Sequence, residues 1–408
     1  MQSGRRWLRL GLGALLLLAA LGVLVLSVVL HVRYGGGTLE RISADSMDVH
    51  ADFDTFFRSA EVALAGGDVY NTGARLVNLN PPIWTVLMLP FTFMEPLDAY
   101  RLFGLISLFM MLGSAAWMAG ELRLRAGWAV VAVGVVLFSS PMLATLALGQ
   151  MYPVLVLGLV AAWVMDRRGK YLLAGLALGL VMALKPSLAP LILWPAVRKR
   201  WDMTGTTIIS GAVATLVGSL VLGPYTTIRY AEVVLKADID GFWDNASLAS
   251  VATRTFTDTR FAEPLAILPW SVVAAYVVGI ALIIVTAVKI RGGSEAGLWA
   301  LISASLLASP IAWNNYLLLL APGILLLLAR GRIPLAFLLL ALQFIPQQYP
   351  SLWNESDTVL ATLALSSYMY VLAAHWLSFV TVGKESRRAK RTTFVEEPTE
   401  PDRKPAQA

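Results

Sequence analysis

The chain has 408 residues, of which 57% are hydrophobic and only 14% are charged, whereas a soluble domain carries about a quarter charged residues. The formal net charge of +6 does not indicate nucleic-acid binding, because the basic residues lie in short loops between apolar runs, where they set membrane orientation. The absence of cysteine excludes disulfides, thiolate nucleophiles and cysteine-ligated metals, and His31, His50 and His375 show no metal-ligand spacing.

Apolar runs fill most of the chain. Many have roughly 15–25 residues, which is the length of a helix that crosses a bilayer. The first run is too long for a typical signal peptide and lacks a small-residue cleavage pattern after it, so we interpret it as a retained helix. Together the runs predict an all-α polytopic membrane protein. In chain order they are 7–31, 81–95, 99–119, 126–147, 150–165, 170–184, 186–197, 205–223, 266–290, 295–309, 314–329, 332–346 and 359–381.

Basic clusters between these runs predict the orientation of the helices. The positive-inside rule places all the clusters in the cytoplasm if one run does not cross. Run 81–95 is short and contains three prolines, so we expect it to be re-entrant, interfacial or broken. This gives about twelve crossings with both termini inside, whereas thirteen crossings would put several clusters outside. The clusters are Arg123/Arg125, Arg167/Arg168/Lys170, Arg198/Lys199/Arg200, Lys289/Arg291, Arg330/Arg332 and 384–391.

This topology divides the chain into a membrane domain, residues 1–383, and a tail, residues 384–408. The tail is charged, contains proline and has no apolar period, so we expect it to be disordered and cytoplasmic. Runs 170–184, 186–197 and 332–346 are short, and such segments tend to line a cavity within the protein.

The outer loops carry nearly all the polar residues that could support catalysis. Nucleotide substrates are cytoplasmic, so an outer site must take its donor from the membrane, for example a lipid-linked sugar. Sugar transfer from a lipid phosphate to a hydroxyl needs a base for the acceptor and positive charge or hydrogen-bond donors for the leaving phosphate. The outer loops are 32–80, 224–265 and the turns near 149–150, 185–186, 309–316 and 343–357.

Asp52 and Asp54, in the first outer loop, are the candidates for the base. The apolar spacing after Asp54 predicts a helix with Phe57, Ala60 and Leu64 on one face. Because aspartate is a favoured N-cap, a capping role for one of the pair is an equal alternative. Capping by one aspartate leaves the other available for catalysis.

Lys185 lies between two apolar runs and would face outward, against the positive-inside trend. It could snorkel to the interface or contact a phosphate, and we weigh the two equally. The loop 224–265 mixes charged residues with aromatics, which suits sugar and phosphate binding, although most of these residues singly would also suit a solvated loop. Its candidates are Arg229, Lys236, Asp238, Asp240, Trp243, Asp244, Asn245, Ser247, Arg254, Asp258 and Arg260.

Two polar breaks in the apolar pattern add further candidates. Gln150 follows a long apolar run and could bond a sugar hydroxyl or cap a helix. Trp313, Asn314 and Asn315 lie between two apolar runs. The alternative for this second break is an interfacial aromatic belt.

In this order, these positions resemble glycosyltransferase family 87, whose members are polytopic GT-C enzymes. The resemblance spans residues 45–330 and no single motif in it is decisive. The positions that carry it are Asp52-Phe53, Phe56-Phe57, Ser59-Ala60, Gly66-Gly67-Asp68-Val69-Tyr70, Pro81-Pro82, Gly149-Gln150, Lys185-Pro186, Asn245 with Ser247 and Leu248, Arg254, Ser309-Pro310 and Trp313.

The resemblance implies an inverting α-(1→2)-mannosyltransferase that uses polyprenyl-phosphate-mannose and acts outside the cytoplasm. Its acceptor would be a glycolipid or lipoglycan of the phosphatidylinositol mannoside or lipomannan type, and no cofactor or metal is expected. By this resemblance Asp52 is the general base and Lys185 faces the donor phosphate. Relatives often carry histidine after the tryptophan of the Ser-Pro motif, where this chain has asparagine. If that histidine helps hold the donor phosphate or the acceptor, its role is reduced or moved in this chain. The expected substrate-binding residues are Lys185, Gln150, Asn245, Ser247, Arg254, Trp313, Asn314, Asn315 and Tyr70.

Two rival functions remain open on the sequence. The resemblance also covers decaprenyl-phosphoarabinose-dependent arabinofuranosyltransferases, which differ in the sugar. A transporter or flippase would instead need ionisable residues within its helices and repeat symmetry. The apolar runs are nearly free of internal charge, which counts against ion coupling.

Overall fold

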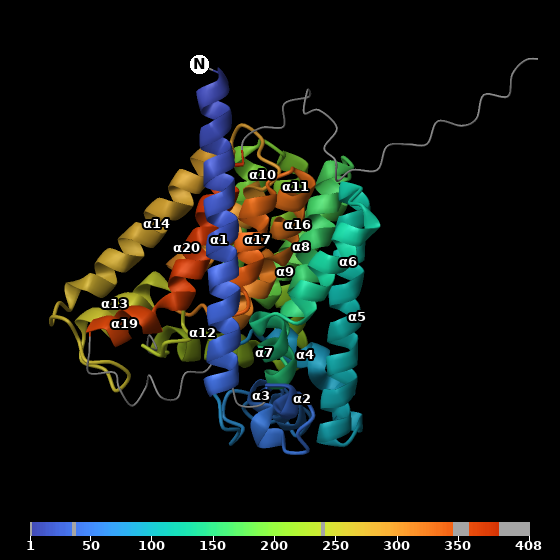
Figure 1. Ribbon diagram of the computed structural model, residues 1–408. Coiled ribbons are helices and arrows are strands. Elements are labelled where there is room, and N and C mark those ends of the chain that lie inside the picture. The colour runs from blue at the N-terminus through green and yellow to red at the C-terminus, as the bar shows by residue number, and fades with distance from the viewer. Residues whose placement is uncertain (1, 35–37, 238–240, 346–358, 383–408) are drawn as a thin grey trace, which may run out of the picture.

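The computed structural model describes residues 2–34, 38–237, 241–345 and 359–382. These residues form helices and no strand, which confirms the all-α prediction (Figure 1). The expected tail, residues 384–408, lies outside the described residues, as do Asp238 and Asp240.

Four of the described helices are long and apolar enough to cross a membrane, and a fifth span results if one bent pair is counted as a single crossing. Shorter apolar helices of 10–17 residues account for other predicted runs, so the number of about twelve crossings stays a prediction. The long helices are α1 (Gln2–Tyr34), α5 (Pro96–Leu122), α11 (Trp201–Leu222) and α14 (Trp270–Ile290), and the bent pair is α6 (Ala126–Leu137) with α7 (Ser140–Leu148).

Several runs that look continuous in sequence are broken in the structure. Run 126–147 bends by 51° between α6 and α7, where Pro141 opens the second helix. Run 81–95 forms a short helix followed by a 3-10 turn, as its prolines predicted. The broken pieces are α4 (Pro82–Met88) with η2 (Leu89–Phe93), η3 (Pro186–Ile192) with α10 (Leu193–Val197), η4 (Asn314–Leu320) with α16 (Ala321–Ala329), and α19 (Val359–Leu365) with α20 (Ser367–Val380).

The core is made of short helices that are apolar on all sides. Nearly all residues of α15 (Gly297–Ala308) and α16 are buried, as expected for helices surrounded by other helices. Helix α17 (Ile333–Leu342) packs on α16, and α1 packs on α17. Helix α8 (Tyr152–Arg167) contacts α15 through the rings of Trp163 and Trp299, and α9 (Tyr171–Leu184) packs on α8. At Gly179, a Cβ atom would lie 2.3 Å from the Thr207 carbonyl oxygen of α11, so glycine lets α9 and α11 pack closely.

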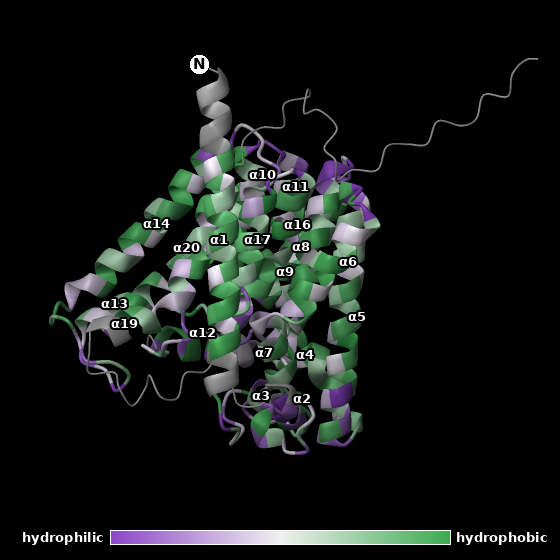
Figure 2. Cartoon of the chain, viewed as in Figure 1, coloured by the Kyte–Doolittle hydropathy of each residue, from purple (hydrophilic) through white to green (hydrophobic). Residues whose placement is uncertain are grey.

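Both long loops that were predicted to lie outside carry short helices, as expected. The first loop holds α2 (Thr38–Ile42), η1 (Met47–Val49) and α3 (Ala51–Leu64), and the second holds α12 (Pro224–Lys236) and α13 (Leu248–Phe256). Figure 2 shows hydrophobic residues along the long helices and hydrophilic residues gathered towards their ends.

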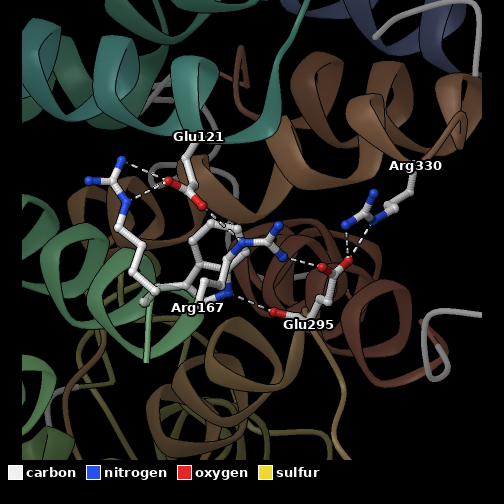
Figure 3. Close-up of polar contacts among 6 residues, drawn as sticks. Glu121, Arg167, Glu295 and Arg330 are labelled. Carbon is white, nitrogen blue, oxygen red and sulfur yellow. Dashed lines mark hydrogen bonds and ion pairs between the residues drawn. The ribbon is translucent and has the colours of Figure 1, made fainter. Parts of the chain in front are cut away.

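Ion pairs join the helix ends on the side of the molecule away from α3. Arg167, at the end of α8, pairs with Glu121, near the end of α5, and with Glu295, between α14 and α15. Arg330, after α16, pairs with the same Glu295 (Figure 3). Because α8 begins beside the polar residues at the other end and is 16 residues long, about 24 Å separates the two ends. Two of the predicted basic clusters therefore meet at one face.

Candidate active site

Helix α3 presents the two candidate aspartates. It begins at Ala51, four residues earlier than the apolar spacing predicted, and its N-cap is His50 without a side-chain capping bond. The alternative in which one of the two aspartates caps this helix is therefore wrong. Both aspartates lie in the first turn, while Phe53, Phe56 and Phe57 are buried on the core side.

His50 ties the start of α3 to the end of α7. Its ring is fully buried, with Nδ1 2.7 Å from the Ala147 carbonyl oxygen and Nε2 3.1 Å from that of Ala44. The ring stacks on Tyr100 at a centroid distance of 3.5 Å, and the Tyr100 hydroxyl donates to the Leu146 carbonyl. These contacts bring the first turn of α3 beside the residues that follow α7.

The turn after α7 requires glycine at position 149. Gly149 has φ of +71°, and a Cβ atom there would lie 2.5 Å from Cβ of Phe53. We therefore expect Gly149→Ala to push α3 away from Gln150, lowering both the unfolding temperature and the rate of catalysis. Backbone strain of this kind costs about 1–3 kcal/mol, and the clash adds to it.

The matched control for this prediction is Gly73→Ala. Gly73 has φ of +72°, but no atom lies within 4 Å of the Cβ position, so this variant carries the backbone strain alone. Thermal unfolding and activity are measured on both variants. If both variants lose unfolding temperature and activity equally, the contact between Gly149 and Phe53 does not hold α3 in place.

Asp52 lies half-buried in the first turn of α3, where three of the predicted site residues come together. Desolvation raises the pKa of its carboxyl group from 3.8 to about 6, while a hydrogen bond from Gln150 and the charge of Lys185 lower it. The three residues come from α3, from the turn after α7 and from the end of α9. A carboxylate with a pKa this close to neutrality suits a general base.

Asp54 has a different environment. Nε of Arg58, one turn along α3, lies 2.9 Å from each of its carboxylate oxygens. The Arg58 side chain is 48% exposed. Asp54 is thus occupied by an ion pair within its own helix, whereas Asp52 meets residues from other elements.

Lys185 follows α9, and its ammonium group is held by two tyrosines. Nζ donates a hydrogen bond of 2.7 Å to the hydroxyl of Tyr316. It also lies 4.6 Å from the ring centroid of Tyr316 and 5.9 Å from that of Tyr152. The two rings contact each other with a centroid distance of 4.6 Å. Tyr152 also interacts electrostatically with Asp52 and Asp244, which adds Asp244 to this cluster.

Asn245 and Ser247 bind the segment that contains the Ser-Pro motif. The Asn245 amide donates to the Pro310 carbonyl at 3.1 Å and accepts from the Ala312 backbone N–H at 2.9 Å. The Ser247 hydroxyl donates to the same Pro310 carbonyl at 3.2 Å and also caps α13. Both side chains are fully buried. They hold the loop before α13 to the segment that precedes η4.

Arg254 is also fully buried and supports the loop that precedes α13. Its guanidinium group donates to the carbonyl oxygens of Gly241 and Phe242 at 3.1 and 2.6 Å, and to the Ser250 hydroxyl at 3.1 Å. All of these bonds are to protein groups, so Arg254 supports the loop. Direct contact with substrate stays a prediction for this residue.

The remaining predicted residues lie around this cluster. Tyr70 is buried, which raises the pKa of its hydroxyl above the usual value, and it donates to the Asn80 carbonyl. Asn314 and Asn315, which follow Trp313, are buried, and the Asn314 amide donates to the Ser140 hydroxyl at 3.2 Å. No contact between these residues and Asp52 is seen in the described part of the chain, so their binding roles stay predictions.

Sequence reasoning missed three residues that complete the site: His50, Tyr152 and Tyr316. The two tyrosines lie directly beside motifs that it did single out, two residues after Gln150 and one after Asn315. Aromatic residues are common at the membrane border, so the sequence around these two tyrosines does not mark them as site residues. Within the described residues, no group of three acidic or histidine side chains could hold a metal ion.

Comparison with known proteins adds one match. The sequence model of glycosyltransferase family 87 matches residues 78–310, which is more than half of the chain. The matched region includes Gln150, Lys185 and Asn245, and Asp52 precedes it. No curated protein matches the chain.

Proposed function

Because the chain belongs to glycosyltransferase family 87 and is therefore a membrane glycosyltransferase, we propose that it transfers mannose from polyprenyl-phosphate-mannose. The acceptor is a hydroxyl of a glycolipid or lipoglycan of the phosphatidylinositol mannoside or lipomannan type. The product linkage is α-(1→2), and the reaction inverts the anomeric configuration.

The observation that carries the proposal is the meeting of Asp52, Gln150 and Lys185. The Asp52 carboxylate accepts a hydrogen bond from Gln150 and interacts electrostatically with the Lys185 ammonium, although Asp52 and Lys185 are 133 residues apart in sequence. Sugar transfer from a lipid phosphate needs these two functions at the reacting centre, one for the acceptor proton and one for the leaving phosphate.

In the proposed reaction, the acceptor hydroxyl oxygen bonds to C1 of the sugar while the bond between C1 and the phosphate oxygen breaks. Asp52 accepts the proton of the hydroxyl. The electron pair of the broken bond leaves with the polyprenyl phosphate, whose charge Lys185 stabilises. Gln150 donates a hydrogen bond that keeps the Asp52 carboxylate oriented towards the acceptor.

The proposed site faces the extracytoplasmic side of a cell membrane. The support is the distribution of charge along the bundle. Arg167 and Arg330 pair with Glu295 (Figure 3) at the end of the molecule away from α3, which carries Asp52 (Figure 1), and basic residues are retained in the cytoplasm. A site on the outer face draws on lipid-linked donors because nucleotide sugars are confined to the cytoplasm.

The test is an assay of the purified protein with polyprenyl-phosphomannose and, separately, with polyprenyl-phosphoarabinose, followed by linkage analysis of the product. The proposal predicts transfer of mannose and an α-(1→2) product. If the protein transfers only arabinose, its donor is polyprenyl-phosphoarabinose and the mannose assignment is wrong. Movement of the donor across proteoliposomes without a glycosylated product would indicate a flippase.

A further inference from the structure

The ammonium group of Lys185 is held by a neutral partner. Nζ donates to the Tyr316 hydroxyl at 2.7 Å, and its longer distance of 4.6 Å to the ring centroid shows that the hydroxyl is the closest contact. In the described part of the chain, Lys185 forms no ion pair. It therefore differs from Arg58 and Arg229 at the same end, which pair with Asp54 and Asp68.

A neutral partner leaves the charge of the lysine available. A carboxylate in contact with Lys185 would neutralise the ammonium and compete with an incoming anion, whereas a phenol accepts one of the three N–H bonds and leaves two. The long stem of lysine is flexible, so an unheld ammonium would sample many positions. A hydrogen bond to a fixed hydroxyl removes that freedom before the anion arrives.

Tyr316 is itself held in place. Its side chain is only 4% exposed, its backbone N–H donates to the Trp313 carbonyl at 2.9 Å, and its ring packs against Tyr152, which is 1% exposed. The position of the hydroxyl is therefore fixed by the packing of η4 against the start of α8. Groups fixed in this way before binding avoid the cost of reorganisation at the moment of reaction.

We propose that Tyr316 is a positioning residue that holds the Lys185 ammonium where the phosphate of the lipid-linked donor binds. The inference rests on the proposed function, because it takes the ligand of Lys185 to be that phosphate. Tyr316 acts through the lysine, and Tyr152 supports it by fixing its ring.

The test is a double-mutant cycle with Lys185→Ala and Tyr316→Phe, in which the KM for polyprenyl-phosphomannose is measured. Phenylalanine keeps the ring packing and removes only the hydroxyl. We expect Tyr316→Phe to raise the donor KM about tenfold, which is the scale of a hydrogen bond to a charged group. If Tyr316 acts through Lys185, the double variant has the same KM as Lys185→Ala.

The chain offers a matched control at its other end. The Arg200 guanidinium donates to the Tyr171 hydroxyl and lies 4.4 Å from the ring centroid, so Tyr171→Phe removes the same kind of contact away from the site. We expect an unchanged donor KM for this variant. An equal rise in KM would attribute the effect of Tyr316→Phe to general loosening of the fold and would overturn the inference.

The outcomes separate the inference from the proposed function. If Lys185→Ala leaves the donor KM unchanged, the phosphate role of Lys185 in the proposed function fails, and the inference fails with it. If Lys185→Ala raises the KM but Tyr316→Phe has no effect or adds independently, the inference alone is overturned. Should Tyr316→Phe fail to fold, Lys185→Arg keeps the charge and moves it, so a wild-type KM in that variant contradicts the positioning role.

Discussion

Replacing Asp52 by asparagine is expected to lower the rate of sugar transfer by about 10²–10⁴-fold, the range over which general bases contribute. Asparagine has the shape of aspartate and keeps an acceptor for Gln150, but it cannot take the proton of the acceptor hydroxyl. Donor binding should stay near the wild-type value because Lys185 is unaltered. The measurement is single-turnover transfer at saturating donor, together with donor Kd.

The stability of the same variant separates loss of chemistry from loss of folding. Asp52 has a folded-state pKa of about 6, raised from 3.8 mainly by desolvation. When folding raises the pKa of a carboxyl group, the folded protein loses stability as the pH rises towards and through the folded-state pKa, because the charged form is disfavoured in the folded state. At pH 7.5, Asp52→Asn should therefore unfold at the same temperature as the wild type or a higher one. The difference in unfolding temperature between the variant and the wild type should narrow as the pH falls through 6.

Asp54→Asn is the matched control for this substitution. It makes the same chemical change two residues along α3 and breaks a pair with a half-exposed arginine, which is worth about 1 kcal/mol or less. We expect less than about a tenfold loss of transfer. A larger loss for Asp54→Asn than for Asp52→Asn would show that the wrong aspartate has been assigned as the base.

Replacing Lys185 by alanine is expected to have the second largest effect. It removes the cation that interacts electrostatically with Asp52, and hydrogen bonds to charged groups contribute about 1.5–3 kcal/mol. The donor KM should rise by roughly 10–150-fold, with a smaller change in the KM for the acceptor. Kinetics with each substrate varied in turn measure this difference.

Arg229→Ala provides the control for charge at this end of the molecule. Arg229 is also a cation at this end, but it pairs with Asp68 at 3.2 Å and with Glu232 at 2.9 Å. Its removal should leave the donor KM unchanged. If Arg229→Ala and Lys185→Ala raise the donor KM equally, then Lys185 acts through the general surface charge and makes no specific contact with phosphate.

Hydrophobic periodicity predicted where the helices are, but it did not predict where they bend. The prolines of run 81–95 suggested a broken segment, and α4 with η2 is one. Pro141 lies inside run 126–147 in the same way, but the continuous apolar pattern predicts a single span there. The structure bends this run by 51°. A long apolar run dominates the pattern in sequence, while the bend depends on what α7 packs against.

The start of α3 shows a second limit. Local signals placed the helix after Asp54, and the structure begins it at Ala51. The residue before it, His50, bonds to the carbonyl of Ala147, 97 positions away. A contact over that distance leaves no local trace in the sequence. Aspartate remained a reasonable cap on propensity alone, and tertiary packing decided otherwise.

The candidate site was predicted as residue types, without the contacts between them. Asp52, Gln150 and Lys185 were each singled out from a different segment, and the structure brings them together. Asn245 bonds to the backbone of Pro310 and Ala312, while its predicted contact with substrate stays a prediction. A polar side chain in a loop can serve either purpose, and the sequence does not distinguish them.

The pH dependence of kcat/KM for the acceptor, measured between pH 5 and 8 with polyprenyl-phosphomannose, tests most directly whether Asp52 is the base. The account predicts a rate that rises with pH, is half-maximal near the Asp52 pKa of about 6, and levels off once the carboxylate is ionised. In Lys185→Ala the midpoint should move to higher pH, because the charge of Lys185 lowers the pKa of Asp52. A profile that is flat over this range, or a midpoint that Lys185→Ala leaves unchanged, would contradict the account.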